Sequence, residues 1–257
     1  MARSLNPRAY ETDKPTFDVY FRNYERVFAP YADRDIRLLE LGINQGGSLK
    51  LWRDYFDRGT ISAIDINPVT LDDPTGRIRV YQGLQQDTAL LDRVRQENAP
   101  EGFDIIIDDC SHVGEFTAIS FWHLFDRHLK PGGLYVIEDW GTGYMAGRSD
   151  GRRYRPHGST TSLRSRLRPF VERLLLLPSL QASSGVRRVL AWGMNHLVRR
   201  KFPSHQMGLV GFVKQLVDEA GMDDITCPPW GSPPYRPSRF ARLEITHGQA
   251  FIIKASP

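Results

Sequence analysis

The sequence predicts an α/β fold in which a Rossmann-like, doubly wound and mostly parallel sheet carries helices on both faces. Apolar runs rich in β-branched residues recur at five places, with helix-length polar stretches between them: 36–41, 61–66, 78–81, 103–107 and 134–137. Strands buried on both faces show such continuous apolar runs. Ligands of parallel sheets gather at the carboxyl ends of the strands, so we expect the functional residues there.

The later part of the chain continues this pattern after one interruption. An amphipathic stretch at 209–220 predicts a helix, and the apolar run 250–254 predicts a last strand. Between 141 and 203 the alternation stops, and a glycine-rich stretch precedes two segments with helical periodicity. We therefore expect one domain over 1–257 with a helical insertion or lid at 141–203.

Composition is that of a globular protein. Of the 257 residues 40% are hydrophobic and 25% carry charges of mixed sign, which is enough for one buried core. No apolar run reaches membrane-spanning length, and the first residues lack a signal peptide, so we expect a cytoplasmic protein without stable membrane insertion. The two cysteines, Cys110 and Cys227, form no C-x-x-C pair, which fits a reducing compartment.

The net charge of +4 comes from the excess of arginine within 148–201. We interpret this segment as a solvated basic face.

A glycine-rich turn follows the first predicted strand. That strand ends at Glu40 and Gly42, and the turn continues through Asn44, Gly46 and Ser48 into a helix. A dinucleotide-binding turn would read G-x-G-x-x-G and would avoid an acid beside a diphosphate. An acidic residue here suits a cofactor with a cationic amino acid tail, so the turn predicts S-adenosylmethionine.

Two further residues support this cofactor by their order along the chain. Asp65 ends the second predicted strand, where a carboxylate can accept hydrogen bonds from both ribose hydroxyls. Gln85 follows the third strand, at the height expected for an adenine ring. The alternatives are a strand-end cap for Asp65 and a surface side chain for Gln85. Their occurrence in strand order favours the cofactor.

Acidic residues also end the fourth and fifth predicted strands. We assign Asp108 to cofactor binding, and we expect Asp109, Glu138 and Asp139 to converge as the hard oxygen ligands that Mg²⁺ requires. His112 lies three residues after Asp109 and can face the same pocket. A metal lowers the pKa of a hydroxyl, and a neutral histidine can take its proton, so the pattern predicts methyl transfer to an alcohol. The alternative is that these acids only cap helices or anchor loops.

These motifs resemble a known family. These residues are similar to those of the class I, magnesium-dependent sugar O-methyltransferases, and most of all to the macrolide-sugar methyltransferases of the mycinamicin type: Glu40-Leu41-Gly42, Asp65, Asp109-x-x-His112 and Glu138-Asp139. The resemblance covers 13–144, with a weaker echo at 204–219.

The resemblance carries implications for the site and the substrate. It implies S-adenosylmethionine and Mg²⁺ as cofactors, Asp109, Glu138 and Asp139 as metal ligands, His112 as general base, and a sugar or oligosaccharide as acceptor. A narrower similarity, to the 1-O-methyltransferase of methylmannose polysaccharide synthesis, implies a methylated mannoside.

The sequence departs from that family in places and leaves alternatives. Leu84 stands where the macrolide enzymes have an acid beside the adenine-reading glutamine, their large amino-terminal extension is missing, and 141–203 has no counterpart. Catechol-type methyltransferases share the geometry but usually have lysine where His112 stands, so histidine favours a sugar over a phenol.

Two competing functions remain. A pI of 9.1 and the stretch Ser232-Pro233-Pro234-Tyr235, which imitates an amino-methylating box, suggest a nucleic-acid methyltransferase, but such a box must follow the fourth strand. A basic amphipathic stretch at 184–201 suggests a membrane-surface binder. For that stretch we favour core packing or formation of a homodimer, and we expect no nucleic-acid partner.

Overall fold

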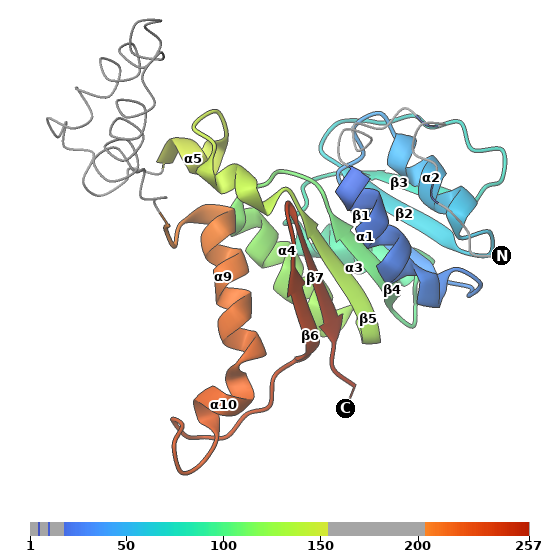
Figure 1. Ribbon diagram of the computed structural model, residues 1–257. Helices are drawn as coiled ribbons and strands as arrows, with labels where there is room; N and C mark the ends of the chain where they lie inside the picture. Colours follow the sequence, from blue (N-terminus) through green and yellow to red (C-terminus); the bar gives the residue numbers. More distant parts are fainter. Residues whose placement is uncertain (1–4, 6–9, 11–17, 154–203, 257) are drawn as a thin grey trace, which may run out of the picture. The chain divides into compact units, whose positions relative to one another are not determined.

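In the computed structural model the described residues are 5, 10, 18–153 and 204–256 (Figure 1). The chain divides into two units, one formed by 1–153 with 206–257 and the other by 154–205. The helices expected within 162–201 lie outside the described residues. The division into one domain with an insertion at 141–203 therefore stays a prediction.

A seven-stranded sheet forms the centre of the first unit, in the order β3-β2-β1-β4-β5-β7-β6. Its strands are β1 Arg37–Leu41, β2 Thr60–Asp65, β3 Ile78–Gln82, β4 Phe103–Asp108, β5 Leu129–Glu138, β6 Phe240–Ile245 and β7 Gln249–Lys254. The first five pair in parallel, whereas β7 is antiparallel to both β5 and β6. The predicted doubly wound, mostly parallel sheet is confirmed. The sequence did not predict β6, because this edge strand is largely exposed and has charged residues among its apolar ones.

Helices cover both faces of this sheet (Figure 1). The helical elements are α1 Asp18–Phe28, η3 Ala29–Tyr31, α2 Gly47–Tyr55, α3 Thr88–Asn98, α4 Gly114–Arg127, η4 Trp140–Tyr144, α5 Ser149–Arg153, α9 Gly208–Ala220 and α10 Met222–Thr226. Successive strand residues point to opposite faces, so Leu38 joins the core beneath α1 and α2 while Leu39 joins the core beneath α3, α4 and α9. Both cores are rich in aromatic rings, which bury large apolar areas.

One carboxylate ties the start of two helices together. Asp150, on α5, accepts hydrogen bonds from the backbone N–H of Gly114 at 2.9 Å and of Leu209 at 2.7 Å. These are unpaired donors of the first turns of α4 and α9, where negative charge is favourable. A Cβ on Gly114 would lie 2.1 Å from the backbone of Gly208, so the two helix starts touch through their main chains. The segment after β5 is thereby attached to both helices.

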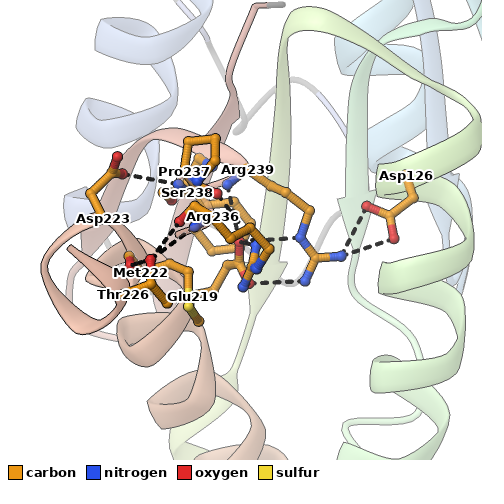
Figure 2. A network of polar contacts seen from close by, with 10 residues as sticks. Asp126, Glu219, Met222, Asp223, Thr226, Arg236, Pro237, Ser238 and Arg239 are labelled. Carbon is orange, nitrogen blue, oxygen red and sulfur yellow. Dashed lines mark hydrogen bonds and ion pairs between the residues drawn. The ribbon is translucent and has the colours of Figure 1, made fainter. Parts of the chain in front are cut away.

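A polar network joins the end of α9 to α4 (Figure 2). The buried Glu219 accepts hydrogen bonds from the guanidinium groups of Arg236 and Arg239, and Arg239 also forms an ion pair with Asp126 at 3.0 Å. The same guanidinium lies 3.9 Å from the centre of the Trp122 ring. The segment before β6 is thus fixed to the helical layer.

Among the described residues, no helix is long and apolar enough to cross a membrane.

Replacement of Glu219 should reveal this network in the pH dependence of stability. Burial by itself would raise the pKa of Glu219, but hydrogen bonds from Arg236 and Arg239 lower it to about 2. In the unfolded chain the pKa of this carboxyl is about 4.3. Its ionised form therefore makes its full contribution to stability above about pH 4.3, and that contribution is lost as the pH falls through the folded-state pKa of about 2. We expect Glu219→Gln to lower the free energy of unfolding by about 1–3 kcal/mol at pH 7 because it loses hydrogen bonds to charged donors.

The measurement is urea unfolding of wild type and Glu219→Gln at pH 7 and pH 3. The difference between them should shrink at pH 3. The exposed Glu97→Gln is the matched control and should behave like wild type at both pH values. Equal destabilisation by Glu219→Gln at the two pH values would show that its charge is not the cause.

Candidate active site

A cavity of about 310 Å³ lies at the carboxyl ends of the central strands. Its lining contains five of the residues singled out from the sequence: Gly42, Asn44, Asp65, Gln85 and Asp109. Its other lining residues are Ile43, Ile66, Asn67, Leu84, Gln86, Cys110, Ser111 and Phe116. The volume lies at the lower end of the range for small-molecule sites.

The turn after β1 requires glycine at its first position. Gly42 has φ +91°, and a Cβ there would lie 2.1 Å from the carbonyl oxygen of Asp109. A hydrogen bond from the Asp109 N–H to the Leu41 carbonyl at 2.9 Å supports the close approach, and the Gly42 N–H donates to the Ile64 carbonyl of β2 at 2.8 Å. The glycine thus allows the loops after β1 and β4 to meet beside the cavity.

Asp65 holds the shape of the cavity through its own carboxylate. Oδ2 accepts the backbone N–H of Ile43 at 2.9 Å, and Oδ1 accepts that of Asn67 at 2.8 Å. Each carboxylate oxygen can accept more than one hydrogen bond, so both oxygens retain capacity for a ligand. Asp65 thus anchors the two loops that contain Ile43 and Asn67. Its expected binding of the ribose hydroxyls stays a prediction.

Gln85 lines the cavity but directs its amide into the protein. Its Nε2 lies 3.3 Å from both carboxylate oxygens of Asp108, and its Oε1 accepts the backbone N–H of Ser111 at 3.0 Å. The side chain is buried, in contrast to the surface position considered as the alternative. In this conformation the amide supports the loop after β4, and its reading of an adenine edge stays a prediction.

Four residues expected to bind the cofactor do not line this cavity: Glu40, Gly46, Ser48 and Asp108. Glu40 lies on the strand face that meets α2, where it accepts the Trp52 indole N–H at 2.9 Å. Asp108 lies on the opposite face, 3.3 Å from the Ser120 hydroxyl of α4. Side chains within a strand alternate between faces, so an acid at a strand end can point into a helical layer.

Burial changes the acidity of Asp108. Its removal from water, together with the negative charge of Asp109, raises the pKa of its carboxyl group to about 7.

Gly46 and Ser48, the other two residues that do not line the cavity, shape the start of α2. Gly46 adopts φ +80° before the first turn, and Ser48 is buried within that turn.

Beside the cavity, three side chains from the loops after β4 and β5 come together. Asp109, His112 and Asp139 each offer a ligand atom, and these atoms lie within 4.8 Å of one another. His112 Nε2 is 3.9 Å from an oxygen of Asp109 and 3.9 Å from an oxygen of Asp139. Two carboxylates and an imidazole at this spacing fit a divalent cation with a base next to it. Their roles as ligands and base stay predictions.

The structure adds two tyrosines of α1 that sequence reasoning missed. The Tyr20 hydroxyl donates to Asp139 Oδ1 at 2.7 Å, and the Tyr24 hydroxyl donates to Glu138 Oε1 in a very short hydrogen bond. Glu138 is buried and is not one of the three clustered residues, although it was expected beside Asp109 and Asp139. Spacing of four residues predicts that both tyrosines share one helix face, but not what that face meets.

Burial raises the pKa of both tyrosine hydroxyls. Desolvation, followed by the hydrogen bond to Asp139, raises the pKa of Tyr20 well above its ordinary value. Desolvation and the charge of Glu138 do the same for Tyr24. Each hydroxyl therefore remains a hydrogen-bond donor to its carboxylate at neutral pH.

The Ser232-Pro233-Pro234-Tyr235 stretch follows α10 and precedes β6, in a different part of the fold from the end of β4. It therefore does not occupy the place of an amino-methylating box. Most of the basic segment 148–201, including 184–201, lies outside the described residues.

Known proteins provide the context for this site. No family model matches the chain. The mycinamicin VI 2''-O-methyltransferase of Micromonospora griseorubida is 42% identical over 146 residues, which are 54% of this chain and 36% of that protein. A rhamnosyl-tetracenomycin 3'-O-methyltransferase of Streptomyces olivaceus is also 42% identical over 146 residues, with the same coverage. The chain thus spans about a third of the length of these curated relatives.

A solved structure extends the similarity over almost the whole chain. The MycE methyltransferase from the mycinamycin biosynthetic pathway, in complex with Mg and SAH, is 28% identical with a TM-score of 0.64. The match covers 99% of this chain and 55% of MycE. A MycE complex that also contains mycinamycin VI matches with a TM-score of 0.63. The chain therefore has the class I methyltransferase fold and is a homologue of O-methyltransferases that modify the sugars of macrolide and tetracenomycin glycosides.

Proposed function

We propose that the chain is an S-adenosylmethionine-dependent, Mg²⁺-assisted O-methyltransferase that acts on a hydroxyl of a sugar or oligosaccharide. The observation that carries this proposal is the position of Asp109. It lines the cavity and also belongs to the cluster with His112 and Asp139. A donor in the cavity and an acceptor at the cluster would therefore be adjacent, as group transfer requires. Its homologues methylate sugar hydroxyls, which supports a sugar as the acceptor.

The residues at the cavity and the cluster fit both proposed cofactors. When bound, S-adenosylmethionine supplies the methyl group and Mg²⁺ makes the acceptor hydroxyl more acidic. Asp109 and Asp139 would hold the ion, and Tyr20 fixes the orientation of the Asp139 carboxylate. Asp65 would bind the ribose, and Gly42 permits a ligand to approach the main chain. Glu138, which the Tyr24 hydroxyl orients, would contribute a further carboxylate to the ion.

His112 performs the proton transfer in this proposal. It accepts the proton of the acceptor hydroxyl on Nε2, the atom that faces both Asp109 and Asp139. An oxygen of each carboxylate lies 3.9 Å from this nitrogen, so the base stands beside the ion that they would hold. The side chain is mostly buried, so a neighbouring acceptor would exclude water from the base during transfer.

The decisive experiment supplies labelled S-adenosylmethionine with a panel of acceptors, with and without Mg²⁺. Glycosides, methylmannosides, catechols and RNA belong in the panel. We expect transfer to a saccharide that stops on exhaustive chelation and returns with Mg²⁺. A preference for catechols or RNA over every saccharide would contradict the proposed acceptor. Methylmannosides test the narrower acceptor class separately.

Removal of the Asp65 carboxylate should weaken cofactor binding. We expect Asp65→Ala to lower the affinity for the demethylated product at least about 10-fold, since hydrogen bonds to a charged acceptor contribute about 1.5–3 kcal/mol. Isothermal titration calorimetry measures this directly. The exposed Asp72→Ala is the control and should bind normally. Normal affinity in a folded Asp65→Ala protein would remove Asp65 from the cofactor site.

Removal of the proposed base should slow turnover without preventing binding. A positioned general base contributes roughly 10²- to 10⁴-fold, so we expect His112→Ala to lose activity by that factor. Circular dichroism and calorimetry with the demethylated product check that the fold and the cofactor site remain. Turnover near the wild-type rate across neutral pH would assign the proton to another group.

Loss of the Tyr20 hydroxyl should loosen the metal site. Removal of a partner that orients a metal ligand typically costs roughly 10- to 100-fold in affinity, and we expect Tyr20→Phe to weaken Mn²⁺ binding by such a factor. Electron paramagnetic resonance reports free Mn²⁺ independently of activity. Tyr10→Phe removes another tyrosine–aspartate hydrogen bond, to Asp54, and serves as the control. If both variants bind Mn²⁺ like wild type, Tyr20 does not position the site.

A further inference from the structure

The described part of the chain contains two groups of three side chains that could share one metal ion. One is the cluster at the candidate active site. The other consists of Asp92 on α3, His123 on α4 and His128, which immediately follows α4. His128 precedes β5, and its carbonyl accepts the N–H of Phe103, the first residue of β4, at 2.7 Å. The second group therefore lies at the amino end of β4, whereas the candidate active site follows its carboxyl end.

The geometry of this second group is convergent. The Nε2 atoms of His123 and His128 each lie 2.6 Å from the same oxygen, Oδ1 of Asp92. The two rings are 5.1 Å apart between centroids and inclined at 76°, so their nitrogens approach that oxygen from different directions. Two imidazole nitrogens and one carboxylate oxygen are a ligand set suited to Zn²⁺.

Burial divides the group into a fixed part and a movable part. The side chains of His123 and His128 are only 13% and 10% exposed, whereas that of Asp92 is 52% exposed. The imidazoles are therefore enclosed by the protein, whereas the carboxylate borders the solvent. Water can reach the exposed carboxylate and serve as a further ligand.

We propose that Asp92, His123 and His128 form a second metal site, which binds Zn²⁺ through both Nε2 atoms, one carboxylate oxygen and water. Zn–N and Zn–O bonds of about 2.0–2.2 Å in a tetrahedron place neighbouring ligand atoms about 3.3 Å apart. The present separation of 2.6 Å is that of a hydrogen bond. An outward movement of the exposed carboxylate by less than about 1 Å lengthens both nitrogen–oxygen separations to about 3.3 Å.

Nitrogen ligands also separate this site from the candidate active site. Mg²⁺ prefers oxygen ligands, which Asp109 and Asp139 supply, while imidazole nitrogens favour Zn²⁺. Zinc at the second site would link α3 to the end of α4 and would stabilise the folded protein. It takes no part in methyl transfer, because it lies at the other end of β4.

The test uses the full chain, freed of any purification tag and stripped with a chelator. Excess Mg²⁺ is kept present to occupy the candidate active site. Zn²⁺ is titrated by calorimetry, and Co²⁺ is added in parallel because its visible absorption reports tetrahedral coordination. We expect one equivalent of tightly bound Zn²⁺, a tetrahedral Co²⁺ spectrum, and an unfolding temperature that rises with Zn²⁺.

Variants of the two clusters identify the site. We expect His123→Gln to reduce Zn²⁺ affinity at least about 100-fold and to abolish the rise in unfolding temperature. Loss of a residue that only hydrogen-bonds to a metal ligand costs roughly 10- to 100-fold, and loss of the ligand itself should cost more. His112→Gln is the matched control and should keep both responses. Asp92→Asn, at a half-exposed position, repeats the test if His123→Gln fails to fold. Absence of zinc binding in wild type, or binding lost in His112→Gln and kept in the second-cluster variants, would overturn the proposal.

Discussion

Hydrogen bonds from two tyrosines of α1 to the acidic pair that ends β5 are the contact on which the candidate active site depends. Tyr20 holds Asp139 and Tyr24 holds Glu138, so one helix face fixes two consecutive carboxylates. A Cβ on Gly248 would lie 1.7 Å from the Tyr20 hydroxyl, which shows how closely α1 packs against the turn between β6 and β7. Without this helix each of the two carboxylates would lose a hydrogen-bond donor.

Backbone strain gathers at the same edge of the sheet. Among the described residues other than glycine, those with positive φ are Asn44, His112 and Asp139, at 48°, 53° and 53°. Such conformations cost about 1–3 kcal/mol each and persist where surrounding contacts overdetermine them. All three lie in loops that follow the carboxyl ends of strands. The fold therefore holds these loops in shapes that direct their side chains into the site rather than in their most relaxed forms.

The two ends of β4 have different chemistry. Its carboxyl end leads into Asp109 and His112, where carboxylates dominate, and its amino end lies beside the two imidazoles of the Asp92 cluster. The rigid central sheet separates them, so a metal at one end would act on stability and a metal at the other on proton transfer. The contrast follows from the strand direction, because loops at opposite ends of a parallel sheet come from different parts of the chain.

The sequence by itself determined the parallel core and the acids and histidine at strand ends, because a buried strand is a local apolar run and parallel strands end at one edge. It therefore located Asp109, His112 and Asp139 together. Only the tertiary structure decided that Glu40 and Asp108 turn into the helical layers, and that α1 contributes Tyr20. That tyrosine lies 119 positions from its partner. Contacts at such separations depend on how helices pack on the sheet, and no local periodicity encodes that packing.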